Sequence, residues 1–131
     1  MTQSTVATAH EESVYRPVMA RLLKVEQMTE LEKLFTVELP GGRSLGNEPG
    51  QFVEVSLFGI GEAPISISSS PSRSNGTFEL CVRNVGDVTN GMHSMEAGAP
   101  LGVRGPFGHG FPVEKMKGKD ILFAAGGLGL A

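Results

Sequence analysis

Small polar side chains and one cation alternate with apolar residues at two places in this chain of 131 residues. Pro64, Ser66 and Ser68 alternate with isoleucines in the first stretch. Cys81 and Arg83 alternate with apolar residues in the second stretch. Because successive side chains of a strand point to opposite faces, the apolar residues would point inward and the polar set outward. Such a flat, hydrogen-bonding surface with one positive charge suits a planar, anionic ligand.

Segment 86–89, which reads Gly-Asp-Val-Thr, adds a group that can bind phosphate. It leads into a short run with helical spacing, in which Val88, Met92 and Met95 share one face. The backbone N–H groups of the first turn, the Thr89 hydroxyl and the helix dipole would together hold a pyrophosphate. Periodicity leaves an alternative open, in which the serines and Arg83 are simply solvated and Thr89 is only an N-cap.

A third feature stands at the end of the sequence. The apolar run 121–125 predicts a buried strand, and Gly126, Gly127 and Gly129 follow it directly. A strand that feeds a glycine-rich turn brings backbone N–H groups against a phosphate in α/β nucleotide-binding domains. We therefore expect residues 114–131 to be a linker and the start of a second, α/β domain.

Short alternating runs separated by Gly, Pro, Asn and Ser predict the elements that position these residues. We expect segment 101–105 to form the closing strand of a mainly β, antiparallel barrel. One short helix, capped by Thr89 and stopped by Gly98 and Pro100, interrupts the strands. The inward-facing residues are expected to be Phe35, Val37, Leu39, Val53, Val55, Leu57, Ile65, Ile67, Phe78, Leu80 and Val82.

Composition excludes several function classes. The formal net charge is −3 and no run of Lys or Arg forms a basic stripe, so neither nucleic acid nor an anionic membrane is an expected partner. Cys81 is the only cysteine, which excludes an internal disulfide and a cysteine-built metal cluster within this segment. No apolar stretch is long enough to cross a bilayer, and we expect a cytoplasmic protein. Residues 1–13 are polar and aperiodic, which predicts a disordered tail.

Two patterns that mimic functional sites are discounted. Segment 42–46 fits the G-x-S-x-G motif of serine hydrolases, but Asn47 and Pro49 cannot continue as the helix that this motif requires. His10, His93 and His109 are far apart in the sequence, and their spacing predicts no metal site. We expect Cys81 to be a small packing residue at the ligand rather than a redox thiol.

Four segments, in this order and spacing, resemble the ferredoxin-NADP reductase superfamily: Ala63-Pro64-Ile65-Ser66-Ile67, then 81–89, 105–112 and 125–131. The most similar branch is that of the electron-transfer subunits of dihydroorotate dehydrogenase, sulfhydrogenase (gamma) and anaerobic sulfite reductase. The resemblance implies an antiparallel Greek-key barrel that binds FAD over residues 14–113. It further implies that the terminal glycines begin an NAD(P)-binding domain.

The resemblance also implies FAD contacts residue by residue. The first family motif lies along the flavin and its phosphates, and it matches Pro64 and Ser66; Ala63 stands where the family has an arginine. The second motif brings a strand to the flavin, and the helix start receives the pyrophosphate, which favours FAD over FMN. The residues implied to bind FAD are Ala63, Pro64, Ile65, Ser66, Cys81, Val82, Arg83, Val88 and Thr89.

The function implied by the resemblance is electron transfer, through flavin, between NAD(P)H and an iron–sulfur partner enzyme in a larger complex. Hydride transfer to flavin needs stacked rings and a dry site, so no catalytic residue is required from this segment. A [2Fe-2S] cluster would belong to residues that follow this chain. The alternative is a flavin-free barrel used for docking or assembly, which the alanine at position 63 makes conceivable.

Overall fold

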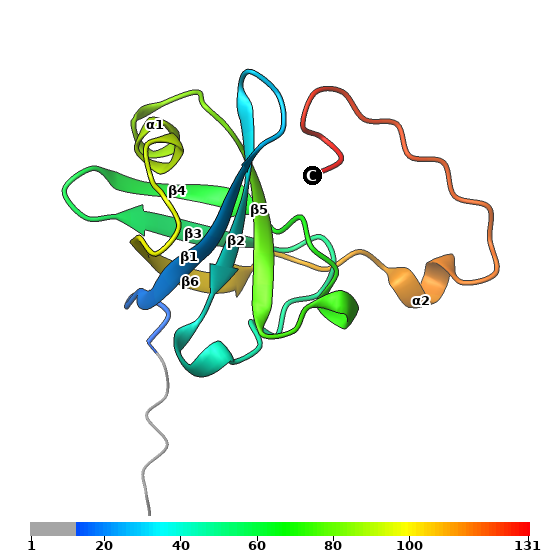
Figure 1. Cartoon of the computed structure of the whole chain (residues 1–131). Coiled ribbons are helices and arrows are strands. Elements are labelled where there is room, and N and C mark those ends of the chain that lie inside the picture. Colours follow the sequence, from blue (N-terminus) through cyan, green and yellow to red (C-terminus); the bar gives the residue numbers. More distant parts are fainter. Residues whose placement is uncertain (1–12) are drawn as a thin grey trace, which may run out of the picture.

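The computed structural model describes residues 13–131, so the predicted tail lies outside the described residues except for Ser13. Six strands and two short helices are the main regular elements of the described residues (Figure 1). The strands are β1 (Val18–Gln27), β2 (Glu32–Glu38), β3 (Phe52–Leu57), β4 (Gly61–Ser66), β5 (Thr77–Arg83) and β6 (Pro100–Phe107). The helices are α1 (Asp87–His93) and α2 (Val113–Met116), and two 3₁₀ turns span Pro40–Gly42 and Pro71–Arg73.

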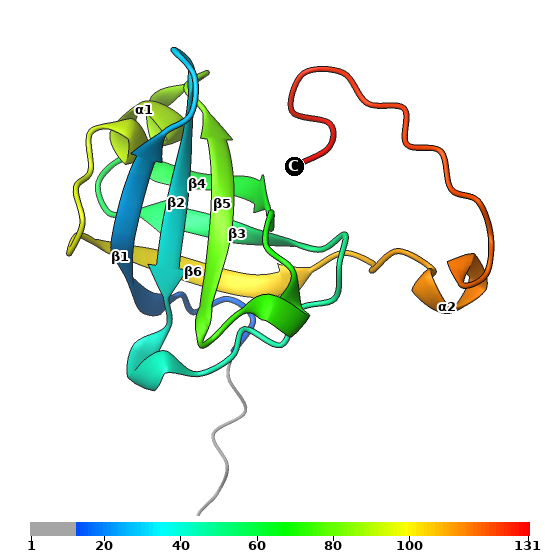
Figure 2. The same ribbon diagram turned by 45° about the vertical axis from the view of Figure 1, so that its right-hand side comes forward.

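The six strands form one curled antiparallel sheet in the order β4-β3-β6-β1-β2-β5 (Figures 1 and 2). The last strand in the sequence, β6, lies in the middle of the sheet between β3 and β1. The expected mainly β, antiparallel architecture is therefore confirmed. Segment 101–105, however, does not close the sheet at an edge, because β6 pairs on both sides.

The two edge strands, β4 and β5, approach each other where β4 ends. The Ser68 N–H donates to the Glu79 carbonyl (2.9 Å), and the Cys81 N–H donates to Ser68 Oγ (3.1 Å). The Glu79 N–H is satisfied by Ser69 Oγ (2.9 Å). These bonds join the edges at one end only, and we call the interval between β4 and β5 the seam.

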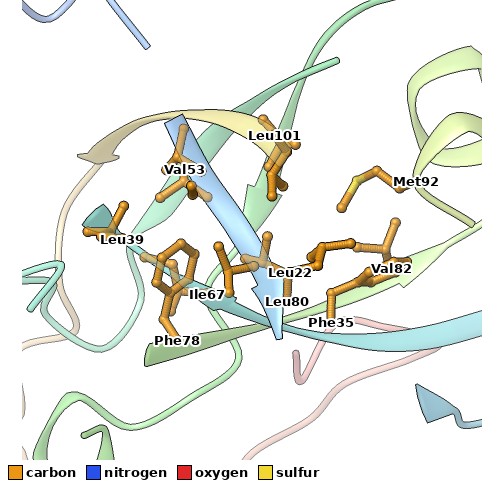
Figure 3. Close-up of a cluster of buried hydrophobic side chains, with 14 of the residues drawn as sticks. Leu22, Phe35, Leu39, Val53, Ile67, Phe78, Leu80, Val82, Met92 and Leu101 are labelled. Carbon is orange, nitrogen blue, oxygen red and sulfur yellow. The ribbon is translucent and has the colours of Figure 1, made fainter. Parts of the chain in front are cut away.

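The interior of the barrel is apolar, as the alternation predicted. Nearly all of the inward-facing residues listed above are buried, and Ile65 is half-buried against them. Leu22, Leu101 and Met92 complete this core from β1, β6 and α1, and Figure 3 shows these side chains pointing toward one another. The same alternation leaves Ser66 and Arg83 exposed on the outside of β4 and β5. The core therefore fixes which residues face outward along the seam.

Two local expectations are wrong. Helix α1 begins at Asp87 with Gly86 in extended conformation before it, so Thr89 is the third helical residue and not the N-cap. The predicted strand 121–125 is irregular, with Leu122 92% exposed. A buried strand requires neighbouring strands, and no strand within residues 13–131 pairs with this segment.

The chain after β6 passes through α2 and returns toward the barrel, so that its last residues lie near β4 and β5 (Figures 1 and 2). Helix α2 overlaps the start of segment 114–131, which was predicted to be a linker leading into a second domain. None of the helices within the described part of the chain has the length and apolarity needed to span a bilayer.

Candidate functional site

Eight of the nine residues implied to bind FAD line one hollow of about 300 Å³ along the seam. They come from β4, β5 and the start of α1: Ala63, Pro64, Ile65, Ser66, Cys81, Val82, Arg83 and Thr89. The ninth, Val88, does not line the hollow and packs against the core instead. The structure therefore brings together residues from two motifs that lie about twenty positions apart in the sequence.

The backbone of the seam offers hydrogen-bonding groups to a ligand. The N–H groups of Glu79, Cys81 and Ser68 face across the seam, as their bonds show. Because alternate residues of a strand direct their N–H groups to the same side, those of Arg83 and Ser66 also face the seam. Strands β4 and β5 are not paired with each other there. The open end of the seam therefore presents donors that suit the polar edge of a planar ring.

Arg83 is the only Lys or Arg among the residues that line the hollow. Its Nε donates to Glu32 Oε1 across the β2–β5 pair, at 2.7 Å. The Arg83 side chain is 44% exposed, whereas that of Glu32 is 9% exposed. The guanidinium is thus anchored through one nitrogen, and the Arg83 side chain as a whole stays partly exposed.

The Thr89 hydroxyl is used by the protein's own backbone. It accepts hydrogen bonds from the N–H groups of Val85 and Gly86 (2.9 Å each) and donates to the Gly86 carbonyl (3.1 Å). Thr89 is only 7% exposed. Its hydroxyl therefore shapes the loop between β5 and α1, and the N–H groups of the first helical turn are the donors that remain for a ligand at this helix start.

The Cys81 thiol lies beside the same hollow. Burial raises the pKa of this thiol above its usual value of 9.0, and the negative charge of Glu32 raises the pKa further. A raised pKa keeps the group protonated at neutral pH and lowers its nucleophilicity. This agrees with the interpretation of Cys81 as a packing residue rather than a redox thiol.

The glycine-rich segment predicted to begin an NAD(P) site lies next to the seam. Gly127 has a positive φ of 58°, and the Gly129 N–H donates to the Gly126 carbonyl (3.0 Å), so these residues form a turn. Leu128 and Ala131 line the same hollow as Arg83. The turn therefore borders the candidate flavin site, although segment 121–125, directly before it, is not a strand.

Sequence reasoning missed Glu32 and Val85. Val85 is 75% exposed and lines the hollow between Arg83 and α1. Glu32 lies 51 positions from Arg83, and only the β2–β5 register brings the two together. Among the described residues no group of His, Cys, Asp and Glu is arranged to hold a metal ion.

Comparison with known proteins gives a consistent result. Residues 19–111 match the family model described as "Oxidoreductase FAD-binding domain". The chain is 43% identical over 120 residues to sulfhydrogenase 2 subunit gamma of Pyrococcus furiosus, covering 89% of this chain and 41% of that protein. It is 35% identical over 121 residues to a probable dihydroorotate dehydrogenase B (NAD(+)) electron transfer subunit of Methanothermobacter thermautotrophicus, covering 92% and 42%.

Solved structures extend the likeness to the fold. An NADH-dependent reduced ferredoxin-NADP oxidoreductase aligns with a TM-score of 0.63 and 27% identity, covering 72% of this chain and 36% of that chain. A cytochrome P450 reductase of Amycolatopsis aligns with a TM-score of 0.67 and 26% identity, covering 79% and 32%. The chain spans about two fifths of the length of the curated relatives that it matches. These findings confirm the family resemblance read from the four motifs.

Proposed function

Because this chain belongs to the oxidoreductase FAD-binding domain family, we propose that it is the FAD-binding portion of a subunit that passes electrons between NAD(P)H and an iron–sulfur enzyme. The observation that carries the proposal is the single hollow lined by eight residues of two family motifs. The names of two relatives, a sulfhydrogenase gamma subunit and an electron transfer subunit, support the same proposal.

The residues present fit the two chemically different parts of FAD. The flavin ring needs a flat surface with hydrogen-bonding edges, which the seam offers through the N–H groups of Ser66 and Arg83. The diphosphate needs positive charge and N–H donors, which Arg83 and the first turn of α1 offer. Ala63 supplies no charge, so Arg83 is the cation that remains for the diphosphate.

Bound FAD supplies hydride chemistry toward a nicotinamide and single-electron chemistry toward an iron–sulfur centre. This chain's own residues bind and orient the cofactor and exclude water from one of its faces. Strands β4 and β5 hold the site on rigid elements, because their inward residues are locked in the core. No proton transfer is asked of Cys81, whose raised pKa keeps it neutral.

The remaining parts of the proposal concern the whole protein. NAD(P)H would bind at a second domain that starts near Gly126, Gly127 and Gly129. A [2Fe-2S] cluster and the iron–sulfur partner subunits would lie outside this chain. The cytoplasmic location stays a prediction, supported by the single cysteine and its suitability to a reducing compartment.

The test is the flavin content of the purified protein. We expect a yellow protein whose extracted cofactor is FAD and not FMN, and a colourless preparation should regain the flavin spectrum when FAD is added. The second candidate, a flavin-free docking module, is favoured by the missing cation at Ala63. A protein that stays colourless and binds no added FAD would support the docking module and exclude the FAD-binding function.

A further inference from the structure

Arg83 stands at the end of a chain of hydrogen bonds that begins in the turn between β1 and β2. In this turn, the N–H groups of Leu31 and Glu32 donate to Thr29 Oγ1 (3.2 and 3.1 Å). Thr29 Oγ1 in turn donates to Glu32 Oε2. The other carboxylate oxygen, Oε1, accepts from Arg83 Nε at 2.7 Å. Both oxygens of Glu32 are therefore fixed, and the buried carboxylate is a rigid anchor.

The anchor leaves most of the guanidinium unused. Of the five N–H donors of an arginine, the bond to Glu32 uses only the one at Nε. Within residues 13–131 the terminal nitrogens, Nη1 and Nη2, have no hydrogen-bond partner, and the side chain is 44% exposed. Two neighbouring nitrogens of an arginine are the geometry that binds phosphate oxygens in pairs.

We propose that Glu32 is a positioning residue, which holds Arg83 so that its terminal nitrogens bind the diphosphate of FAD. This inference rests on the proposed function, because it requires FAD at the seam. Arg83 is the only Lys or Arg lining the hollow, and the diphosphate is the anionic part of FAD.

Two physical effects of Glu32 oppose each other. Fixing a long side chain in advance removes the rotamer entropy that an unanchored arginine would lose on binding. The carboxylate, however, also partly neutralises the guanidinium and so weakens its attraction for phosphate. Glutamine at position 32 would keep an acceptor for Nε and remove the charge. The two effects are therefore separable by comparing Glu32→Gln with Glu32→Ala.

The experiment is a double-mutant cycle on FAD affinity, measured by titrating FAD into purified apoprotein and following the quenching of flavin fluorescence. We expect Arg83→Ala to raise the dissociation constant of FAD about tenfold or more, which is the loss of a charge-assisted bond. Glu32→Ala should raise the dissociation constant several-fold, and Glu32→Gln should restore the wild-type value or better. In the Arg83→Ala background, Glu32→Ala should have no further effect.

Glu38→Ala is the matched control. Glu38 lies on the same strand, β2, and its partner Arg21 is a surface arginine at 3.3 Å that does not line the hollow. This variant should bind FAD as the wild type does. Thermal unfolding of each variant without FAD separates loss of binding from loss of fold.

A salt titration adds a second measurement. If Arg83 had only a structural role, the salt dependence of FAD binding would be the same with and without it. If Arg83 binds the diphosphate, the wild-type dissociation constant should rise more steeply with NaCl than that of Arg83→Ala. Equal slopes, or equal effects of Glu32→Ala with and without Arg83, would overturn the positioning role. A wild-type protein that binds no FAD would instead overturn the proposed function itself.

Discussion

The Arg104–Glu62 pair and the Arg83–Glu32 pair of this barrel differ in how much of each arginine is used. Arg104 on β6 donates from Nε to Glu62 Oε2 (2.9 Å), from Nη2 to Glu62 Oε1 (2.5 Å) and from Nη1 to the Val14 carbonyl (2.7 Å). Its guanidinium also lies over the Phe107 ring at 5.5 Å. Arg83 on β5 makes a single bond, through Nε, to Glu32.

The difference assigns different roles to the same residue types. Arg104 is 19% exposed in its side chain and every nitrogen has a partner, so it ties β6 to β4 and to the segment before β1. Arg83 is more exposed, yet its glutamate is the more buried of the two. A buried anchor that leaves the arginine open is suited to holding a ligand, whereas a saturated pair is suited to holding the fold.

Among the substitutions that distinguish the two pairs, Arg104→Ala is expected to lower the stability of the fold most. This substitution removes the two-point bond to Glu62, the bond to the Val14 carbonyl and the contact with Phe107. We expect the urea midpoint of unfolding to fall clearly, because charge-assisted, paired bonds are stronger than neutral ones. FAD affinity should be unchanged, since Arg104 does not line the hollow.

Arg104→Lys is the matched control for this prediction. A lysine keeps the charge but cannot bind both carboxylate oxygens with a planar fork, so its urea midpoint should lie between those of the wild type and Arg104→Ala. Loss of FAD affinity in a folded Arg104→Ala protein would contradict the division of roles between the two pairs.

A pH titration sharpens the comparison through Glu62. The hydrogen bonds from Arg104 and then Ser56 lower the pKa of Glu62 from 4.5 to about 2. A carboxyl whose pKa is lower in the folded state stabilises the fold above its unfolded pKa, and this contribution declines as the pH falls from about 4.5 to about 2. Urea unfolding at several pH values should show this decline in the wild type. Glu62→Gln should be less stable at neutral pH and should lack that part of the decline.

The outward-facing site residues were predictable because strand alternation is local. The pattern around Ile65 and around Leu80 fixes which side chains point outward, and the family motifs led to the prediction that these side chains contact FAD. Glu32 was missed because its role depends on the pairing of β2 with β5, which links residues 51 positions apart. The strand expected at 121–125 was wrong for a related reason, since strand formation depends on a neighbour that local sequence does not show.

The start of α1 shows a finer limit of sequence reasoning. A threonine near a helix start can itself be the N-cap residue. It can instead stand three residues after the N-cap, where its hydroxyl accepts from the backbone N–H of the N-cap residue. In this structure Gly86 is the N-cap residue, and the Thr89 hydroxyl accepts from the Gly86 N–H. Both arrangements fit the same local sequence, so only the structure separates them.

Thr89→Val tests that second role. The substitution keeps the side-chain volume and removes the acceptor for the Val85 and Gly86 N–H groups. We expect the free energy of unfolding to fall by about 1 kcal/mol, because two N–H groups lose their acceptor. The loss should not be larger, because water can reach these groups in its place. FAD affinity should fall by less than in Arg83→Ala, since the hydroxyl shapes the loop without facing the ligand. Thr89→Ser should behave as the wild type in both measurements.

The smallest expected effect concerns Cys81, which reports on the charge of Glu32. Because burial and then Glu32 raise the thiol pKa, iodoacetamide should alkylate Cys81 in the folded apoprotein more slowly than in the urea-unfolded protein at the same pH. Glu32→Gln should raise the rate modestly by removing the negative charge, whereas Glu62→Gln should leave it unchanged. Bound FAD should protect the thiol, since both use the same hollow. An alkylation rate that does not respond to Glu32→Gln would show that the anchoring carboxylate has little electrostatic influence at the seam, and would weaken the contrast between the open and the saturated pair.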